Sequence, residues 1–148
     1  MVRFKYYGCR EYGDFYAKAM SIFGKKYLER WKPDLIVPVP LHPRKKRMRG
    51  FNQAAYLAER LSVLTGIPWN EHLVKKIRST RSQKKLNAIQ RRQNLKNAYQ
   101  VTEKIPGFSV LVVDDVYTTG STADAMAMCL LEAGAEKVYF LTICAGRA

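Results

Sequence analysis

The sequence predicts an α/β domain with a mostly parallel, twisted sheet that is flanked by helices. Two short apolar segments of strand type, Leu35–Val39 and Val110–Val113, are each followed by a helical pattern, and a third apolar run spans Val138–Ile143. Strands that alternate with helices pair in parallel, and the helices cover both faces of the sheet. Because ligands of such folds bind beyond the carboxyl ends of the strands, we expect the functional site there.

Length and composition favour one compact domain over residues 1–148. The chain is 47% hydrophobic and 26% charged, a typical globular composition. No apolar run approaches the roughly 20 residues that span a bilayer, and the first residues are charged where a secretory signal would be apolar. These features predict a cytoplasmic protein. The cysteines Cys9, Cys129 and Cys144 are odd in number and form no CxxC pair, so we expect buried free thiols and no zinc site in this chain.

The elements follow in order along the chain. Residues 1–32 are expected to form an amino-terminal helical segment, with one amphipathic helix from about Tyr12 to Trp31 that ends near Pro33. Its apolar residues recur at helical spacing: Phe15, Ala19, Ile22, Phe23 and Tyr27. The strand Leu35–Val39 is expected to lead into a basic loop over residues 44–50. Asn52 is suited to cap a helix that runs to about Leu64.

The second half of the chain contains the longest irregular stretch. Residues 73–99 are polar and basic and predict a mobile flap or hood region followed by a short helix near Ala88–Leu95. After the strand Val110–Val113 and a turn, a helix is expected from about Thr122 to Ala133, and Gly134 ends it.

The charge of the chain indicates anionic partners. The formal net charge is +14, and lysines and arginines dominate residues 44–96, where only Glu59 and Glu71 oppose them. Such a field attracts pyrophosphate, nucleotides, nucleic acid or an acidic membrane surface. Charge alone does not choose among these partners.

The segment from Val110 to Thr122 is the most informative. Four apolar residues predict a buried strand, and two carboxylates, Asp114 and Asp115, follow at its end. The small residues from Thr118 onward predict a tight turn that opens a helix, whose first N–H groups suit a phosphate. Gly120 allows close backbone approach. Carboxylates that accept hydrogen bonds from a diol, next to a phosphate cradle, match ribose 5-phosphate; the alternative is an ordinary connection with Thr122 as N-cap.

This segment resembles the ribosyl-pyrophosphate motif of type I phosphoribosyltransferases. The resemblance implies that Asp114 and Asp115 bind the ribose hydroxyls, and that Mg²⁺ is held through the ligand, with these acids as further candidate ligands. It implies a type I phosphoribosyltransferase-like core and a phosphate turn formed by Val116, Thr118, Thr119, Gly120, Ser121 and Thr122. Purine-specific members have an aspartate where this chain has Thr118, so a hypoxanthine or guanine acceptor is less expected.

A second resemblance covers most of the chain. Residues 37–53, VPVPLHPRKKRMRGFNQ, are similar to the ComF branch of this superfamily, the late-competence proteins linked to DNA uptake. The resemblance implies a pyrophosphate loop with Arg44 and Lys45, and a flap whose candidate residues are Lys84, Lys85 and Arg91. A solvated basic surface remains the alternative for each of these cations. ComF-like proteins usually begin with a cysteine-rich zinc ribbon, which this sequence lacks.

Three functions remain open on this evidence. The first is a phosphoribosyltransferase that binds 5-phosphoribosyl-1-pyrophosphate and transfers phosphoribosyl to an unknown nitrogen nucleophile. The second is a non-catalytic module that binds single-stranded DNA or a competence protein and retains the pocket. Residues 75–97 contain no aromatic residue for base stacking, which disfavours this module. The third is a sensor of ribosyl pyrophosphate or a nucleotide-like ligand.

Overall fold

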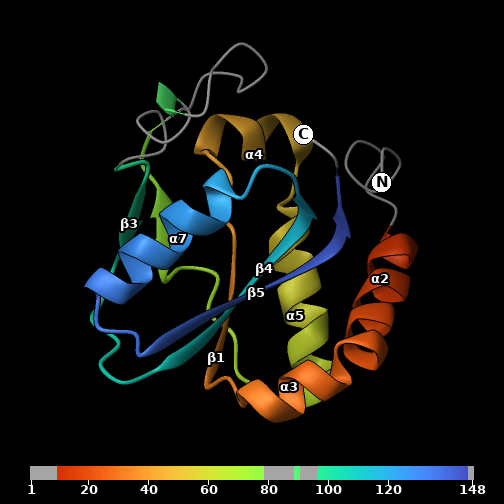
Figure 1. The fold of residues 1–148 in the computed structure, drawn as a ribbon. Coiled ribbons are helices and arrows are strands. Elements are labelled where there is room, and N and C mark those ends of the chain that lie inside the picture. Colours follow the sequence, from red (N-terminus) through yellow and green to blue (C-terminus); the bar gives the residue numbers. More distant parts are fainter. Residues whose placement is uncertain (1–9, 79–88, 91–96, 147–148) are drawn as a thin grey trace.

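A three-stranded parallel sheet forms the centre of the domain (Figure 1). The computed structural model describes residues 10–78, 89–90 and 97–146. The strand order is β1 (Leu35–Pro38), β4 (Ser109–Tyr117) and β5 (Lys137–Ala145), with β4 in the middle. The predicted fold class, a parallel sheet flanked by helices, is confirmed.

Two hydrophobic clusters cover the two faces of this sheet. One face packs against α2 (Arg10–Phe23), α3 (Lys25–Trp31) and α5 (Gln53–Thr65), and the other against α7 (Ser121–Glu132). Successive residues of β4 point to opposite faces: Val110 and Val112 belong to the α7 cluster, Leu111 and Val113 to the α5 cluster. All four are fully buried, which explains the continuous apolar run of this strand.

The amino-terminal helical segment differs from the prediction in two ways. The expected single helix is divided at Gly24 into α2 and α3. In addition, most of the apolar stripe is exposed: Phe15, Ile22, Phe23 and Tyr27 all lie at the surface. The inner face instead carries smaller or more adaptable residues such as Ala17 and Met20, because α2 packs along α5 and against β5.

The basic segment after β1 is a helix, and the prediction of a loop over residues 44–50 was wrong. Helix α4 (Pro43–Arg49) begins at Pro43, whose fixed φ suits a first helical position. His42 caps it by accepting a hydrogen bond at Nδ1 from the Arg44 N–H, at 3.3 Å. Gly50 ends the helix with a φ of 79°.

Asn52 caps α5, as predicted. Its Oδ1 accepts from the Ala54 N–H at 3.1 Å, and its Nδ2 donates to the Val39 carbonyl at 3.1 Å. The side chain is buried, so both bonds are shielded from water. Asn52 thereby joins the end of β1 to the start of α5.

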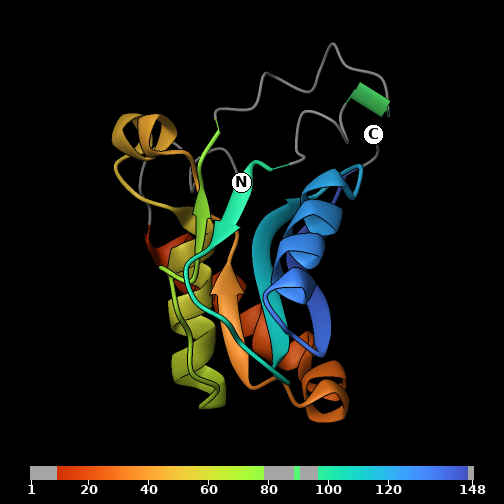
Figure 2. The ribbon, with the colours of Figure 1, turned by 90° about the vertical axis from the view of Figure 1, so that its left-hand side faces the viewer.

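The described part of the basic region contains a strand pair that the sequence analysis did not predict. Strand β2 (Val74–Lys76) pairs antiparallel with β3 (Tyr99–Val101). The pair lies beyond the end of β1, between α4 and α7 (Figure 2). Buried apolar residues in and beside the two strands, among them Leu73, Val74 and Ala98, anchor the pair in the core. The helix expected at residues 88–95 lies mostly outside the described residues, and within them Ile89 and Gln90 are helical.

Two further predictions concern membranes and thiols. Among the described residues, no helix combines the length and apolar character needed to cross a membrane. Cys129 is half-buried and Cys144 is exposed, and both are free, so the prediction of buried thiols was wrong for Cys144. Cys9 lies outside the described part of the chain.

Candidate functional site

Asp114 and Asp115 lie within strand β4 rather than after it. The strand was expected to end at Val113, but β5 is equally long and keeps β4 paired as far as Tyr117. Asp114 is in register with Thr142 and Val116 with Cys144. The Asp115 N–H donates to Asp114 Oδ1 at 2.8 Å, which orients the first carboxylate. The sheet therefore holds both acids at its carboxyl edge, half-buried.

A tight turn follows the two acids and opens α7. Thr118 and Thr119 are exposed, whereas Gly120 is buried and caps the helix with a φ of 78°. Gly120, and not Thr122, is thus the N-cap. The Thr119 and Ser121 hydroxyl oxygens lie 2.9 Å apart, and the Ser121 N–H donates to Thr119 Oγ1 at 3.5 Å. Hydroxyls and the positive end of a 12-residue helix together suit an anion.

Tyr117 closes one side of this turn. A Cβ atom on Gly120 would lie 2.6 Å from the Tyr117 hydroxyl oxygen, so the ring occupies the space beside the glycine. The ring also meets Phe140 of β5 edge to face, with centroids 6.4 Å apart. The turn therefore depends on both the backbone of Gly120 and the absence of its side chain.

The strand pair β2–β3 brings a second group of residues to the same place. The Lys76 ammonium lies 5.5 Å from the centroid of the Tyr99 ring. Burial raises the pKa of Tyr99, the nearby Asp114 raises it further, and a hydrogen bond with the Thr122 side chain opposes the shift. Burial lowers the pKa of Lys76, with Lys45 lowering it further and Asp114 opposing. Both residues are therefore electrostatic neighbours of Asp114.

Sequence reasoning missed Lys76 and Tyr99 as site residues. Strand β2 has only three residues, too few for a periodic pattern, and the side chains of a short strand pair are brought to the site only by tertiary packing. The one available signal was the aromatic residue Tyr99 at the end of the polar region 73–99.

The predicted pyrophosphate and flap residues fall into two groups. Arg44 and Lys45 are exposed on the first turns of α4, which lies at the carboxyl edge of the sheet (Figure 1). Lys45 is near enough to Lys76 to lower its pKa, so the start of α4 lies close to strand β2. The other three candidates, Lys84, Lys85 and Arg91, lie outside the described residues.

The pKa shift of Tyr99 predicts a loss of stability at alkaline pH. A folded pKa above the ordinary value of 10.0 stabilises the fold below pH 10, and this contribution declines as the pH rises further. The lowered pKa of Lys76 has the opposite effect: its contribution to the free energy of unfolding increases with pH and reaches its full value near the ordinary pKa of 10.5. We therefore expect the free energy of unfolding to fall above pH 10.5 and Tyr99→Phe to flatten that fall, measured by urea denaturation. Parallel curves for the two proteins would contradict this, and Tyr27→Phe, at an exposed position, serves as control.

The chain is similar to known proteins over most of its length. The family model described as phosphoribosyl transferase domain matches residues 10–148. Among curated proteins, the DNA utilization protein YhgH of Salmonella typhi is 40% identical over 112 residues, 76% of this chain and 49% of that protein. Competence protein F of Haemophilus influenzae is 40% identical over 109 residues, covering 72% of this chain and 48% of that protein.

A third relative extends the match. Competence protein ComFC of Bacillus subtilis is 33% identical over 133 residues, 89% of this chain and 52% of that protein. These relatives confirm the predicted similarity to the ComF branch. The chain spans about half the length of the curated relatives it matches.

Solved structures share the fold. The crystal structure of purine phosphoribosyltransferase from Pyrococcus horikoshii has a TM-score of 0.52 and 20% identity, and the match covers 85% of this chain and 71% of that protein. At this identity the similarity concerns the fold, and it agrees with the parallel sheet and its helical layers.

Proposed function

This chain belongs to the phosphoribosyl transferase domain family, and from that premise we propose that it binds 5-phosphoribosyl-1-pyrophosphate and transfers the phosphoribosyl group to a nitrogen nucleophile. The observation that supports this most strongly is the pairing of two features at one sheet edge. Asp114 and Asp115 supply acceptors for a sugar diol, and the turn at Gly120 supplies donors for a phosphate. The names of the relatives suggest that the protein serves DNA uptake or use.

The proposed reaction requires charge stabilisation on both sides of the bond that breaks. The anomeric carbon–oxygen bond loosens, and the departing pyrophosphate takes the electron pair. Carboxylates at Asp114 and Asp115 would stabilise the positive sugar, while Lys45 on α4 would stabilise the leaving group. The lone pair of the nitrogen nucleophile then forms the new bond to the anomeric carbon, and its proton passes to solvent.

The side chains at the strand end also fit Mg²⁺. This cation prefers oxygen ligands and usually binds through one or two carboxylates together with substrate phosphates. Asp114 and Asp115 are half-buried carboxylates on adjacent residues, so they offer suitable donors beside the ligand's own oxygens. When bound, the ion would neutralise charge on the pyrophosphate.

Thermal unfolding tests the proposal directly. We expect 5-phosphoribosyl-1-pyrophosphate with Mg²⁺, at about 100 times its dissociation constant, to raise the Tm by roughly 5–10 °C. Ribose 5-phosphate should give a smaller shift because it lacks the pyrophosphate. Pyrophosphate release across a panel of nitrogen bases and amines then tests turnover. An unchanged Tm at millimolar ligand would refute the proposal.

Binding of single-stranded DNA is the second candidate function. It is favoured by the exposed cations of α4, among them Arg44, Lys45 and Arg47, and by the names of the relatives. Binding that depends on phosphate contacts weakens steeply as salt rises. Fluorescence anisotropy with a labelled oligonucleotide across a salt series measures this slope, and no binding at low salt would exclude the function for this chain.

A further inference from the structure

A cleft between α4 and β2 lies beside the proposed sugar site. Its volume is about 360 Å³, which is within the size range of small-molecule sites. One wall comes from the segment after β1 and from α4, the other from residues 71–77. None of residues 114–122 is among the described residues that line it, so the cleft is distinct from the diol and phosphate positions.

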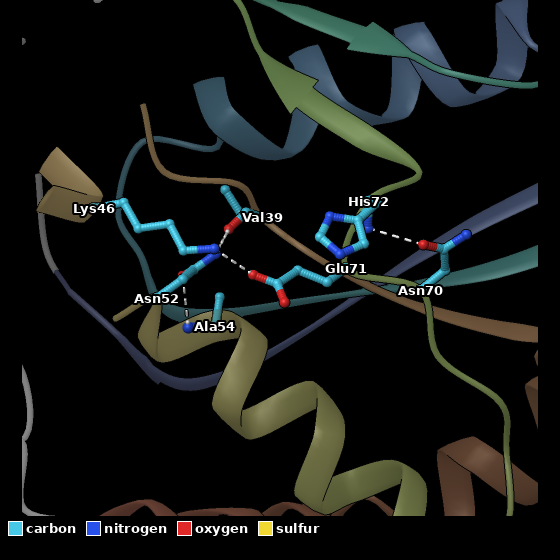
Figure 3. Close-up of polar contacts among 7 residues, drawn as sticks. All are labelled: Val39, Lys46, Asn52, Ala54, Asn70, Glu71 and His72. Atoms are coloured by element: carbon cyan, nitrogen blue, oxygen red, sulfur yellow. Dashed lines mark hydrogen bonds and ion pairs between the residues drawn. The ribbon is translucent and has the colours of Figure 1, made fainter. Parts of the chain in front are cut away.

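One ion pair in this cleft is already satisfied. The Lys46 ammonium lies 2.7 Å from Glu71 Oε1, bridging α4 to the start of the opposite wall (Figure 3). The Glu71 side chain is mostly buried, whereas that of Lys46 is half exposed. Because these two charges neutralise each other, Lys46 is not the cation best placed to attract an anion.

Of the other two lysines that line the cleft, Lys75 is exposed and Lys76 is partly buried, so the charge is desolvated at Lys76. Its ammonium is partly removed from water against the Tyr99 ring, and Lys45 is close enough to repel it. No ion pair between described residues neutralises it. An anion bound next to Lys76 would offset both the desolvation and the repulsion. Asp114 is near enough to raise the pKa of Lys76, so the cleft that Lys76 lines lies near the proposed sugar site.

The rest of the lining shows what else the ligand must offer. Pro40, Pro43, Val74 and Ile77 contribute apolar surface to the cleft. A bare pyrophosphate has no apolar surface to bury against these residues, whereas a ring compound does. An apolar body and a single anionic group are therefore the two properties that this cleft can recognise together.

We propose that the cleft between α4 and β2 is the acceptor subsite, and that Lys76 selects a nitrogen-containing ring compound that carries a carboxylate. The inference rests on the proposed function, and it names the chemical class of the acceptor. Lys76 binds the carboxylate through a charge-assisted hydrogen bond, and the apolar wall contacts the ring. The ring nitrogen is thereby directed towards the anomeric carbon held at Asp114.

Matched ligand pairs test this selectivity. Nicotinate and nicotinamide carry the same ring and differ in a carboxylate against a neutral amide, and orotate differs from uracil by one carboxylate. Isothermal titration of the full chain, with and without pyrophosphate and Mg²⁺, measures their affinities. We expect each carboxylate to bind at least about tenfold more tightly than its neutral partner. Lys76→Met should abolish that preference, so that each carboxylate and its neutral partner bind with similar affinity.

Control variants separate selectivity from folding. Lys137→Met removes an exposed lysine at the opposite end of the sheet and should retain the preference. Lys76→Gln repeats the test with a polar side chain, and thermal unfolding checks that each variant is folded. A missing preference in wild type, or one that survives Lys76→Met, overturns the inference. So does binding of pyrophosphate that depends on Lys76 and displaces the carboxylate ligands, since the cleft would then hold the leaving group.

The outcome is distinguishable from failure of the proposed function. Stabilisation by 5-phosphoribosyl-1-pyrophosphate with no carboxylate preference overturns the acceptor class and leaves the ribosyl site standing. A Lys76-dependent preference without any such stabilisation refutes the proposed transfer reaction, and with it the acceptor role of the cleft.

Discussion

Replacing Asp115 with asparagine is expected to reduce the thermal stabilisation by 5-phosphoribosyl-1-pyrophosphate to half or less at the same ligand concentration. Asparagine keeps the shape of the side chain but removes the negative charge that accepts from a diol and favours a positive sugar. A charge-assisted hydrogen bond contributes about 1.5–3 kcal/mol, so the dissociation constant should rise roughly 10- to 100-fold. Differential scanning fluorimetry with a ligand titration measures this change.

Two companion variants make the Asp115 result specific. Asp114→Asn should weaken binding similarly. An asparagine Oδ1 can still accept the hydrogen bond from the Asp115 N–H, so this variant keeps the local structure. Glu136→Gln removes the same charge from an exposed position at the far end of the sheet and should leave the ligand shift unchanged. Equal shifts in wild type and Asp115→Asn would remove the basis for the sugar site.

Gly120→Ala is expected to lower both stability and ligand affinity. An alanine at a φ of 78° is strained by about 1–2 kcal/mol, which lowers the Tm by roughly 2–8 °C. Its Cβ would also displace the Tyr117 ring, because the two would otherwise be 2.6 Å apart. Moving the ring and relaxing the strained turn both disturb the donors that would bind the phosphate, so the ligand-induced Tm shift should shrink as well.

Gly66→Ala is the matched control for this variant. Gly66 has a similar φ of 75°, ends α5, and has open space around the position of a Cβ. It should therefore lose comparable stability while retaining the full ligand-induced shift. If Gly66→Ala and Gly120→Ala lose ligand stabilisation equally, the effect reflects general destabilisation and the phosphate turn is not at Gly120.

The three strands of the parallel sheet and the helices α5 and α7 were predictable because local patterns and core packing agree. The runs at Leu35 and Val110 are buried on both faces, so each of their residues had to be apolar. Asn52 caps α5 by accepting a hydrogen bond from the N–H of Ala54, two residues later, and sequence alone can indicate such a local bond. The two acids and the glycine turn were recognisable for the same reason, since a strand end and a helix start lie next to each other in the chain.

The parts that were missed depend on tertiary contacts. The stripe at Phe15 and Phe23 has helical spacing, but the side that packs is decided by how closely α2 approaches α5. The helix α4 is short and highly basic, and its start depends on Pro43 and the cap at His42. Lys76 and Tyr99 lie near Asp114 only because tertiary packing places the separate β2–β3 strand pair at that end of the sheet.

The extension of β4 through its two acids has a consequence for the thermodynamics of recognition. Asp114 is held by backbone pairing with β5, so its main chain is ordered when the sheet forms and not when a ligand arrives. Less conformational entropy is then lost on association than if the acids were on a loose connection. Affinity for a sugar should consequently be higher than that of two carboxylates on a connection that becomes ordered only when the ligand binds.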